Sequence, residues 1–213
     1  MFIFSDKSMD KRIEKMPYFT NQDLAKIMNP VSVNVFLERE TKKGEVLRLK
    51  RGIYTTKTKR TEVKINGEVW PYIDYLATNV FVSPSYLSLE SILFSYNIIT
   101  ENVYVTTAIT TKNSTKITNN LWRFTYRNIS EALFWGFEAR KVWKLTYYQA
   151  YPEKALLDYL WLKKDIVFEE SYFEELRLRV ELLNFKRLKQ FVKKFNKRKI
   201  DKCFIFLSKL KWL

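Results

Sequence analysis

The chain has 213 residues, of which 46% are hydrophobic and 16% aromatic, and such a composition can build a packed core. It contains no histidine, one cysteine and only four glycines. These counts exclude His-based catalytic triads, zinc sites that contain histidine and intrachain disulfides, and the scattered glycines exclude the usual phosphate-binding loops. We therefore expect a protein that is not an enzyme and that uses neither a cofactor nor a metal ion.

No stretch approaches the ~18 uninterrupted apolar residues of a membrane-spanning helix. The first residues, Met1 to Lys7, also lack the basic region and long apolar run of a signal peptide. A single cysteine fits a reducing compartment. The sequence thus predicts a cytoplasmic protein with no membrane partner.

The net charge is +15, and it is concentrated at the two ends of the chain. Residues 1–60 contain 14 Lys or Arg and 7 Asp or Glu, residues 61–162 contain 9 of each, and residues 163–213 contain 15 and 7. Basic clusters on separate elements are typical of proteins that bind a polyanion, usually nucleic acid. The alternative is that these charges only solvate exposed helix faces.

Two short helices are predicted near the N-terminal end. The first covers residues 20–28, with Thr20 as its N-cap and Asp23 as the partner in an imperfect capping box. The second covers residues 32–43 and is followed by Gly44, the expected left-handed C-cap. The apolar stripe of this second helix consists of Val33, Phe36 and Leu37.

After this glycine the pattern changes to two short strands, at residues 45–49 and 53–56, joined through Lys50-Arg51-Gly52. Helix, turn, helix and hairpin, in this order, are typical of a winged helix-turn-helix, so residues 1–60 are predicted to form a DNA-binding domain. The alternative is a small helical subdomain with a hairpin and no role in DNA binding. The residues predicted to contact duplex DNA are Ser32, Asn34, Val35, Arg39, Lys42, Lys43, Lys50 and Arg51.

Residues 61–213 are predicted to form a mixed α/β domain, which makes the fold class α+β. Its expected elements are helices at 72–80, 85–97 and 153–162, strands at 103–109, 121–127 and 142–148, and an exposed loop at 110–120. Four charged residues of this region have two interpretations: a polar network that stabilises the domain, or a catalytic pair of carboxylates. Without a nucleophile, metal ligands or a phosphate loop beside them, the first is favoured. They are Glu90, Glu153, Lys154 and Asp158.

The C-terminal end is predicted to form basic amphipathic helices at residues 170–184, 185–199 and 200–213. The cations of the middle helix form a second basic surface, which consists of Lys186, Arg187, Lys189, Lys193, Lys194 and Lys197. Three interpretations stay open for it: a second contact surface for the DNA backbone, a docking surface for a partner or its RNA substrate, or a solvated or membrane-surface face.

Two stretches of the chain, Pro84 to Ser91 and Pro152 to Asp158, resemble the two signature stretches of the AbiEi-type antitoxin family of toxin–antitoxin and abortive-infection systems. Further segments that resemble the family, in its order, are Phe19 to Ala25, Lys50 to Tyr54, Thr106 to Lys112 and Phe124 to Arg127. The sequence departs from the family where Tyr96-Asn97 replaces a common Tyr-Gly pair, a change that a left-handed turn accepts. The last third of the chain contains no segment that aligns.

The resemblance implies a DNA-binding antitoxin whose winged helix represses its own operon. It also implies that the remainder, residues 61–213, neutralises a cognate nucleotidyltransferase-like toxin. Two alternatives from other classes stay open. One is an adaptor that neutralises the toxin by protein contact, with only incidental affinity for nucleic acid, and the other is an RNA- or DNA-processing enzyme.

Overall fold

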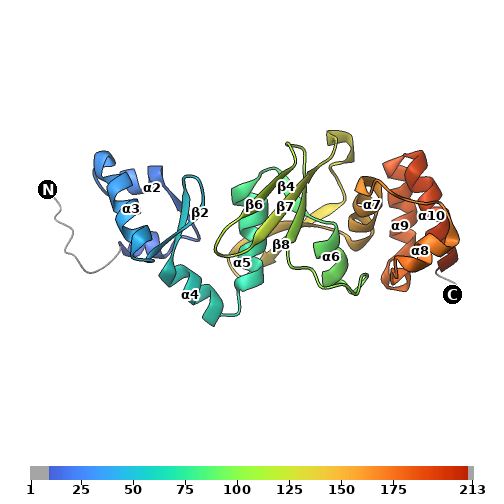
Figure 1. Ribbon diagram of the computed structural model, residues 1–213, viewed down its shortest axis with the longest axis horizontal. Coiled ribbons are helices and arrows are strands. Elements are labelled where there is room, and N and C mark those ends of the chain that lie inside the picture. Colours follow the sequence, from blue (N-terminus) through green and yellow to red (C-terminus); the bar gives the residue numbers. More distant parts are fainter. Residues whose placement is uncertain (1–9, 211–213) are drawn as a thin grey trace. The chain divides into compact units, whose positions relative to one another are not determined.

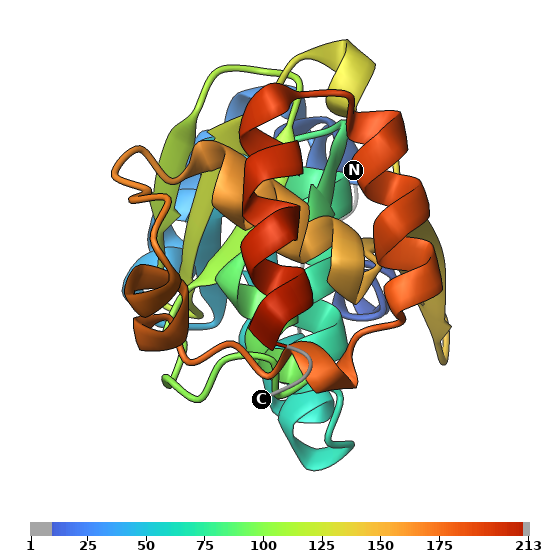
Figure 2. The ribbon, with the colours of Figure 1, turned by 90° about the vertical axis from the view of Figure 1, so that its right-hand side faces the viewer.

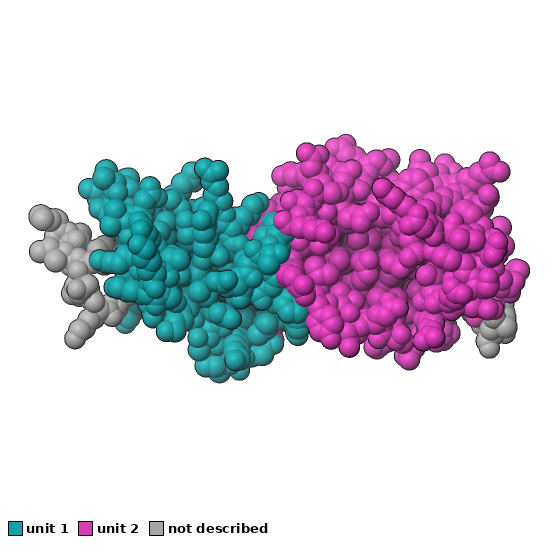
Figure 3. Space-filling view, in the orientation of Figure 1, with its two compact units in different colours: residues 1–73, 117–122 teal, residues 74–116, 123–213 magenta. Residues whose placement is uncertain are grey.

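The computed structural model describes residues 10–210 (Figure 1). The predicted lack of a signal peptide and the end of the last predicted helix, at 211–213, concern residues outside this range. The chain has a mixed α/β fold and divides into two compact units (Figure 3). The first unit comprises residues 1–73 and 117–122, and the second comprises 74–116 and 123–213.

The first unit contains short helices and a three-stranded antiparallel sheet with the strand order β1-β3-β2. Its apolar core brings together Ile13, Phe19, Leu24, Val33, Leu37 and Val46. Its elements are α1 (Lys11–Glu14), β1 (Phe19–Thr20), α2 (Asn21–Ala25), a 3-10 turn (Pro30–Ser32), α3 (Val33–Lys42), β2 (Val46–Lys50), β3 (Ile53–Thr56), α4 (Lys57–Ile65) and α5 (Val69–Tyr75).

The predicted pair of helices and the predicted hairpin are present in this unit. Thr20 caps α2 and forms a reciprocal capping box with Asp23, as predicted, although the helix ends at Ala25. Strands β2 and β3 pair antiparallel around Gly52, whose φ of +74° is the left-handed value expected at the bend. The predictions contained no helix at α4.

A six-stranded mixed sheet has the strand order β6-β7-β5-β4-β9-β8. Its strands are β4 (Ser85–Leu87), β5 (Thr106–Thr110), β6 (Thr115–Thr118), β7 (Arg123–Asn128), β8 (Phe137–Val142) and β9 (Leu145–Ala150). The other elements of this half are a π-helical turn (Leu76–Phe81), α6 (Glu90–Ser95), a 3-10 turn (Glu131–Leu133), α7 (Pro152–Leu162), α8 (Glu170–Glu175), a 3-10 turn (Val180–Leu182), α9 (Phe185–Phe195) and α10 (Arg198–Leu210). Helix α7 packs against α9 and α10, which also contact each other (Figure 2).

Two predictions in the sheet region were wrong. The helix predicted at 85–97 begins as strand β4, which pairs with β5 and β9, and only α6 is helical. A run of three buried residues fits a strand and a buried helix equally, so pairing with both neighbours decides the outcome. The loop predicted at 110–120 is exposed for most of its length but contains β6. Asn97 is left-handed, with a φ of +57°, as the change from glycine required.

The C-terminal helices are shorter than predicted. The helix predicted at 170–184 ends at Glu175, because Arg177 is left-handed and the N–H of Arg179 donates to the carbonyl of Ile98 at 2.9 Å. The helix predicted at 185–199 ends at Phe195, where Asn196 forms a left-handed C-cap. The strand predicted at 142–148 is β9, and its partner β8 was missing from the predictions.

Candidate nucleic-acid interface

Helix α3 separates a buried face from an exposed face. Val33 and Leu37 are buried in the core, and the opposite face contains Asn34 and Val35. All eight residues predicted to contact DNA are exposed: Ser32, Asn34, Val35, Arg39, Lys42 and Lys43 on or beside α3, and Lys50 and Arg51 at the β2–β3 hairpin. The structure thus groups the predicted residues on one helix face and one hairpin of the first unit.

The N-terminal part of this face combines amide and apolar groups. The side chain of Asn34 accepts a hydrogen bond from Asn21 Nδ2 at 3.2 Å and stays exposed. Val31 and Val35, one helical turn apart, are 84% and 68% exposed. Amides pair with adenine edges, and apolar groups contact thymine methyls, so these side chains are suited to reading base edges.

The cations of α3 are paired with carboxylates of the same helix. Lys42 Nζ lies 2.7 Å from Glu38 Oε1, and this contact lowers the pKa of Glu38. The nearly buried Glu40 holds two cations through Oε1, at 2.9 Å from Arg39 Nε and 3.2 Å from Lys43 Nζ. A phosphate must therefore compete with an acid for each of these three cations.

Helix α4 adds cations that the sequence predictions left out. Its N-cap is Thr56, whose hydroxyl accepts a hydrogen bond from the N–H of Lys59 at 2.9 Å. Lys57 is paired with Glu45 at 3.1 Å. Arg60 and Lys64 are exposed, and neither has an ion-pair partner among residues 10–210. The signal in the sequence was the N-cap residue Thr56 before a segment in which Lys, Arg and Glu are frequent. The predicted domain boundary at residue 60 divided this segment.

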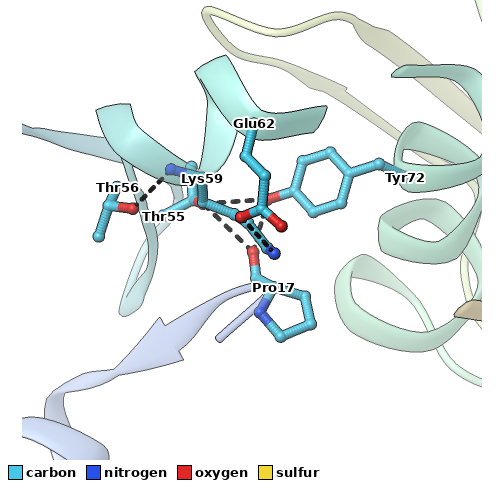
Figure 4. A network of polar contacts seen from close by, with 6 residues as sticks. All are labelled: Pro17, Thr55, Thr56, Lys59, Glu62 and Tyr72. Carbon is cyan, nitrogen blue, oxygen red and sulfur yellow. Dashed lines mark hydrogen bonds and ion pairs between the residues drawn. The ribbon is translucent and has the colours of Figure 1, made fainter. Parts of the chain in front are cut away.

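A hydrogen-bonded network joins α5 and β3 to the segment before β1 (Figure 4). The hydroxyl of Tyr72 lies 2.6 Å from the carbonyl oxygen of Pro17 and 3.0 Å from Thr55 Oγ1, which itself lies 3.2 Å from the same carbonyl. Lys59 and Glu62 form an ion pair beside it at 2.9 Å. These contacts fix β3, and with it the hairpin, against the start of α5.

The second predicted basic surface lies on and just after α9. Leu188, Val192 and Phe195 are buried, as expected on the apolar side of the amphipathic helix predicted at 185–199. The predicted cations of this surface are exposed except Arg187, which is half-buried: Lys186, Lys189, Lys193, Lys194 and Lys197. Residues 185–195 contain no acid.

Two of these cations make contacts within the second unit. The Arg187 guanidinium lies 4.5 Å from the centre of the Tyr151 ring and 3.5 Å from Glu153 Oε2. Lys194 Nζ lies 4.6 Å from the centre of the Trp135 ring. The other four cations have no ion-pair partner within residues 10–210.

The four charged residues predicted to form either a stabilising network or a catalytic pair lie mostly in the core of the second unit. They are Glu90, Glu153, Lys154 and Asp158. Lys154 and Asp158 are fully buried and form an ion pair on α7, and burial lowers the pKa of Lys154 and raises that of Asp158. Tyr86 and Ser88 donate hydrogen bonds to Asp158 Oδ2 at 3.0 and 2.9 Å. Asp158 is fully buried and Glu153 is 2% exposed, so for these two carboxylates the geometry fits the stabilising network.

The surroundings of this network are closely packed. Gly136 has a φ of +76°, and a Cβ there would lie 2.9 Å from Lys154 Cγ. Glu153 Oε1 accepts a hydrogen bond from the N–H of Asn184, the N-cap of α9, at 2.7 Å. Glu90 is half-buried at the start of α6. No group of three or more His, Cys, Asp or Glu within residues 10–210 could hold a metal ion.

Comparison with known proteins gives no family assignment. No family model matches the chain, and no curated protein matches it. No helix within residues 10–210 is both long and apolar enough to cross a membrane.

Proposed function

We propose that the chain is a DNA-binding antitoxin that represses its own operon and neutralises a cognate nucleotidyltransferase-like toxin. The observation that carries the DNA-binding part is the exposed face of α3, with its amide and apolar groups, followed by a hairpin tipped with Lys50 and Arg51. In this proposal the first unit is a winged helix-turn-helix with α3 as its recognition helix and β2–β3 as its wing.

Base reading is assigned to the N-terminal half of α3. Asn34 can donate to and accept from an adenine, and Val35 can contact a thymine methyl group. Lys50 and Arg51 contact the phosphate backbone, which positions the helix but carries no sequence information. The ion pairs of Arg39, Lys42 and Lys43 with Glu38 and Glu40 fit this division, because they reduce the charge that α3 offers to phosphates.

The antitoxin part is supported by the resemblance to the AbiEi-type family. Its two signature stretches are 61 residues apart in the sequence, counted from Ser91 to Pro152. They supply all four members of the buried network: Tyr86 and Ser88 from the first stretch, and Lys154 and Asp158 from the second. A shared internal framework explains why these stretches would be kept together in a family.

The DNA-binding part is tested with the full chain on fluorescent duplexes that carry either the DNA upstream of its own gene or a scrambled sequence. We expect the wild type to prefer the upstream DNA. Asn34→Ala should lose about 1–3 kcal/mol of this preference, the usual value of one base contact. Asn120→Ala is the matched control, since Asn120 is exposed in the same unit but lies outside α3 and the hairpin.

The antitoxin part is tested by growth of cells that co-express the chain with the product of the neighbouring gene. Rescue from a nucleotidyltransferase-like toxin is the expected result. The paired cations of α3 favour one alternative, an adaptor that acts by protein contact with incidental affinity for DNA. Rescue without any preference for upstream DNA would support the adaptor and contradict autorepression.

A further inference from the structure

The β8–β9 hairpin ends in a backbone conformation that its sequence does not favour. Val142 pairs with Leu145, so Trp143 and Lys144 form a two-residue turn. Trp143 occupies the first position of this turn with a φ of +52°. Two-residue hairpins with a positive φ there strongly prefer glycine, because a Cβ crowds the backbone. A large aromatic residue at this position therefore carries a conformational cost.

Packing does not compensate this cost. Trp143 is 56% exposed, whereas Leu89, another residue with a positive φ, is only 4% exposed and packs in the core. Asn97 and Asn196 also have positive φ, but asparagine tolerates that region. Arg177 is exposed with a φ of +47°, but it follows α8, at a helix end where left-handed residues are common. Strained residues that the fold itself does not need cluster at ligand-binding positions. Trp143 is such a residue.

The side chains around Trp143 are cationic. Lys141 and Lys144 are exposed, and neither ammonium group has an ion-pair partner within residues 10–210. Arg140 is exposed too, but it donates a hydrogen bond to the Tyr96 hydroxyl at 3.1 Å and forms an ion pair with Glu138 at 2.8 Å. Strand β8 is an edge of the six-stranded sheet, so one side of the hairpin lacks a neighbouring strand.

We propose that this hairpin binds single-stranded nucleic acid, with one base stacked on Trp143 and the flanking phosphates held by Lys141 and Lys144. An exposed aromatic ring between free cations is the pattern of non-specific single-strand sites. A protein hot spot would instead need a ring of near-neutral contacts that exclude water, and here the neighbours are charged. A duplex offers no unstacked base to the ring, which favours a single strand.

This site goes beyond the proposed function, which assigns duplex reading to the first unit. All three residues of the site, Lys141, Trp143 and Lys144, belong to the second unit. The two activities can therefore fail separately. Loss of preference for upstream duplex DNA concerns α3, and loss of single-strand affinity concerns the hairpin.

The test uses the full chain and a fluorescent oligothymidylate or oligouridylate of about 15 nucleotides, within the usual range of site sizes. Trp143→Ala should weaken single-strand binding roughly tenfold, the value expected for one stacked base, and leave duplex affinity unchanged. Lys141→Gln with Lys144→Gln should reduce the salt slope of single-strand binding by about 1.4, which corresponds to two phosphates.

Two further variants separate binding from folding. Trp143→Gly should bind the single strand as weakly as Trp143→Ala but melt at a higher temperature than the wild type, since it relieves the strained turn. Trp70→Ala is the matched control, because Trp70 is also 56% exposed and lies in the first unit. Wild-type single-strand affinity in both Trp143 variants would overturn the proposal. Equal loss in Trp70→Ala, or equal loss of duplex and single-strand binding, would overturn it as well.

Discussion

Helices α3 and α9 both contain several cations, but only the cations of α3 are paired with acids of their own helix. On α3, Arg39, Lys42 and Lys43 are all paired with glutamates of the same helix. On α9 there is no acid, and Lys186, Lys189 and Lys193 are exposed without an ion-pair partner within residues 10–210. A count of Lys and Arg therefore does not measure the charge that a polyanion can use.

In our proposal the exposed face of α3 and the second basic surface have different functions because of this difference. A helix with internally paired cations contributes little to non-specific affinity, so its value lies in groups such as Asn34 that distinguish bases. A helix with free cations contributes affinity that depends steeply on salt and carries no sequence preference. Variants of each surface measure this difference.

The largest effect is expected from the buried ion pair that supports α9 through α7. Asp158→Asn leaves the ammonium group of Lys154 buried without a counter-charge, which should cost about 3–5 kcal/mol of unfolding free energy. Urea unfolding of the full chain measures it. Asp165→Asn is the matched control, since Asp165 is exposed in the same unit. A loss below about 1 kcal/mol, the range of exposed pairs, would contradict a framework role for the pair.

The next effect concerns the free cations of the second basic surface. Changing Lys189, Lys193 and Lys197 together to Gln should reduce the salt slope of duplex binding by about 2.7, since each phosphate contact contributes about 0.9. Sequence preference should stay. The control changes three exposed lysines elsewhere: Lys112, Lys116 and Lys164. Normal DNA binding with lost toxin neutralisation would indicate a partner-docking surface, and no change in either would indicate a solvated face.

A smaller effect is expected from the hairpin of the first unit. Lys50→Ala together with Arg51→Ala should weaken binding to all duplexes equally and reduce the salt slope by about 1.8, for two phosphate contacts. Fluorescence anisotropy at several salt concentrations measures it. An unchanged salt slope would show that the β2–β3 hairpin does not contact the DNA.

The last effect is the response to pH of Asp74, a carboxyl group that has no ion-pair partner within residues 10–210. Burial raises the pKa of Asp74 to about 7, whereas Lys42 lowers that of Glu38. The pKa of Asp74 in the folded protein lies above its ordinary value of 3.8. The stability that the protonated side chain contributes is therefore fully present below pH 3.8 and is lost as the pH rises through about 7. Unfolding free energy should fall through this window, and Asp74→Asn should flatten the profile. A wild-type profile that rises through pH 7 would contradict this environment.

The sequence was sufficient for the elements whose signals are local. Thr20 and Asp23 specify a capping box within four residues. Gly52 indicates the β2–β3 bend, because glycine readily adopts the positive φ that the bend requires. The amphipathic helix predicted at 185–199 is present as α9, because Leu188, Val192 and Phe195 repeat at helical spacing and are buried. The exposure of the predicted contacts on and beside α3 followed from helical periodicity, and that of Lys50 and Arg51 from their place at a hairpin bend.

Features that depend on distant partners could not be predicted from local patterns. Strand β4 has a helix-compatible sequence and becomes a strand through pairing with β5 and β9. The ion pairs of Glu40 with Arg39 and Lys43 depend on rotamers rather than on spacing alone. The role of Lys154 depends on Tyr86, 68 residues earlier in the chain. Such contacts leave no short-range signal.

The most direct test of the account compares two variants of the full chain across a range of salt concentrations, on upstream and scrambled duplexes. Asn34→Ala should lose the preference for upstream DNA and keep the wild-type salt slope. The α9 triple variant, Lys189, Lys193 and Lys197 to Gln, should keep the preference and lose about 2.7 of the slope. If Asn34→Ala keeps the preference, or if the triple variant loses it, α3 is not the element that reads the sequence.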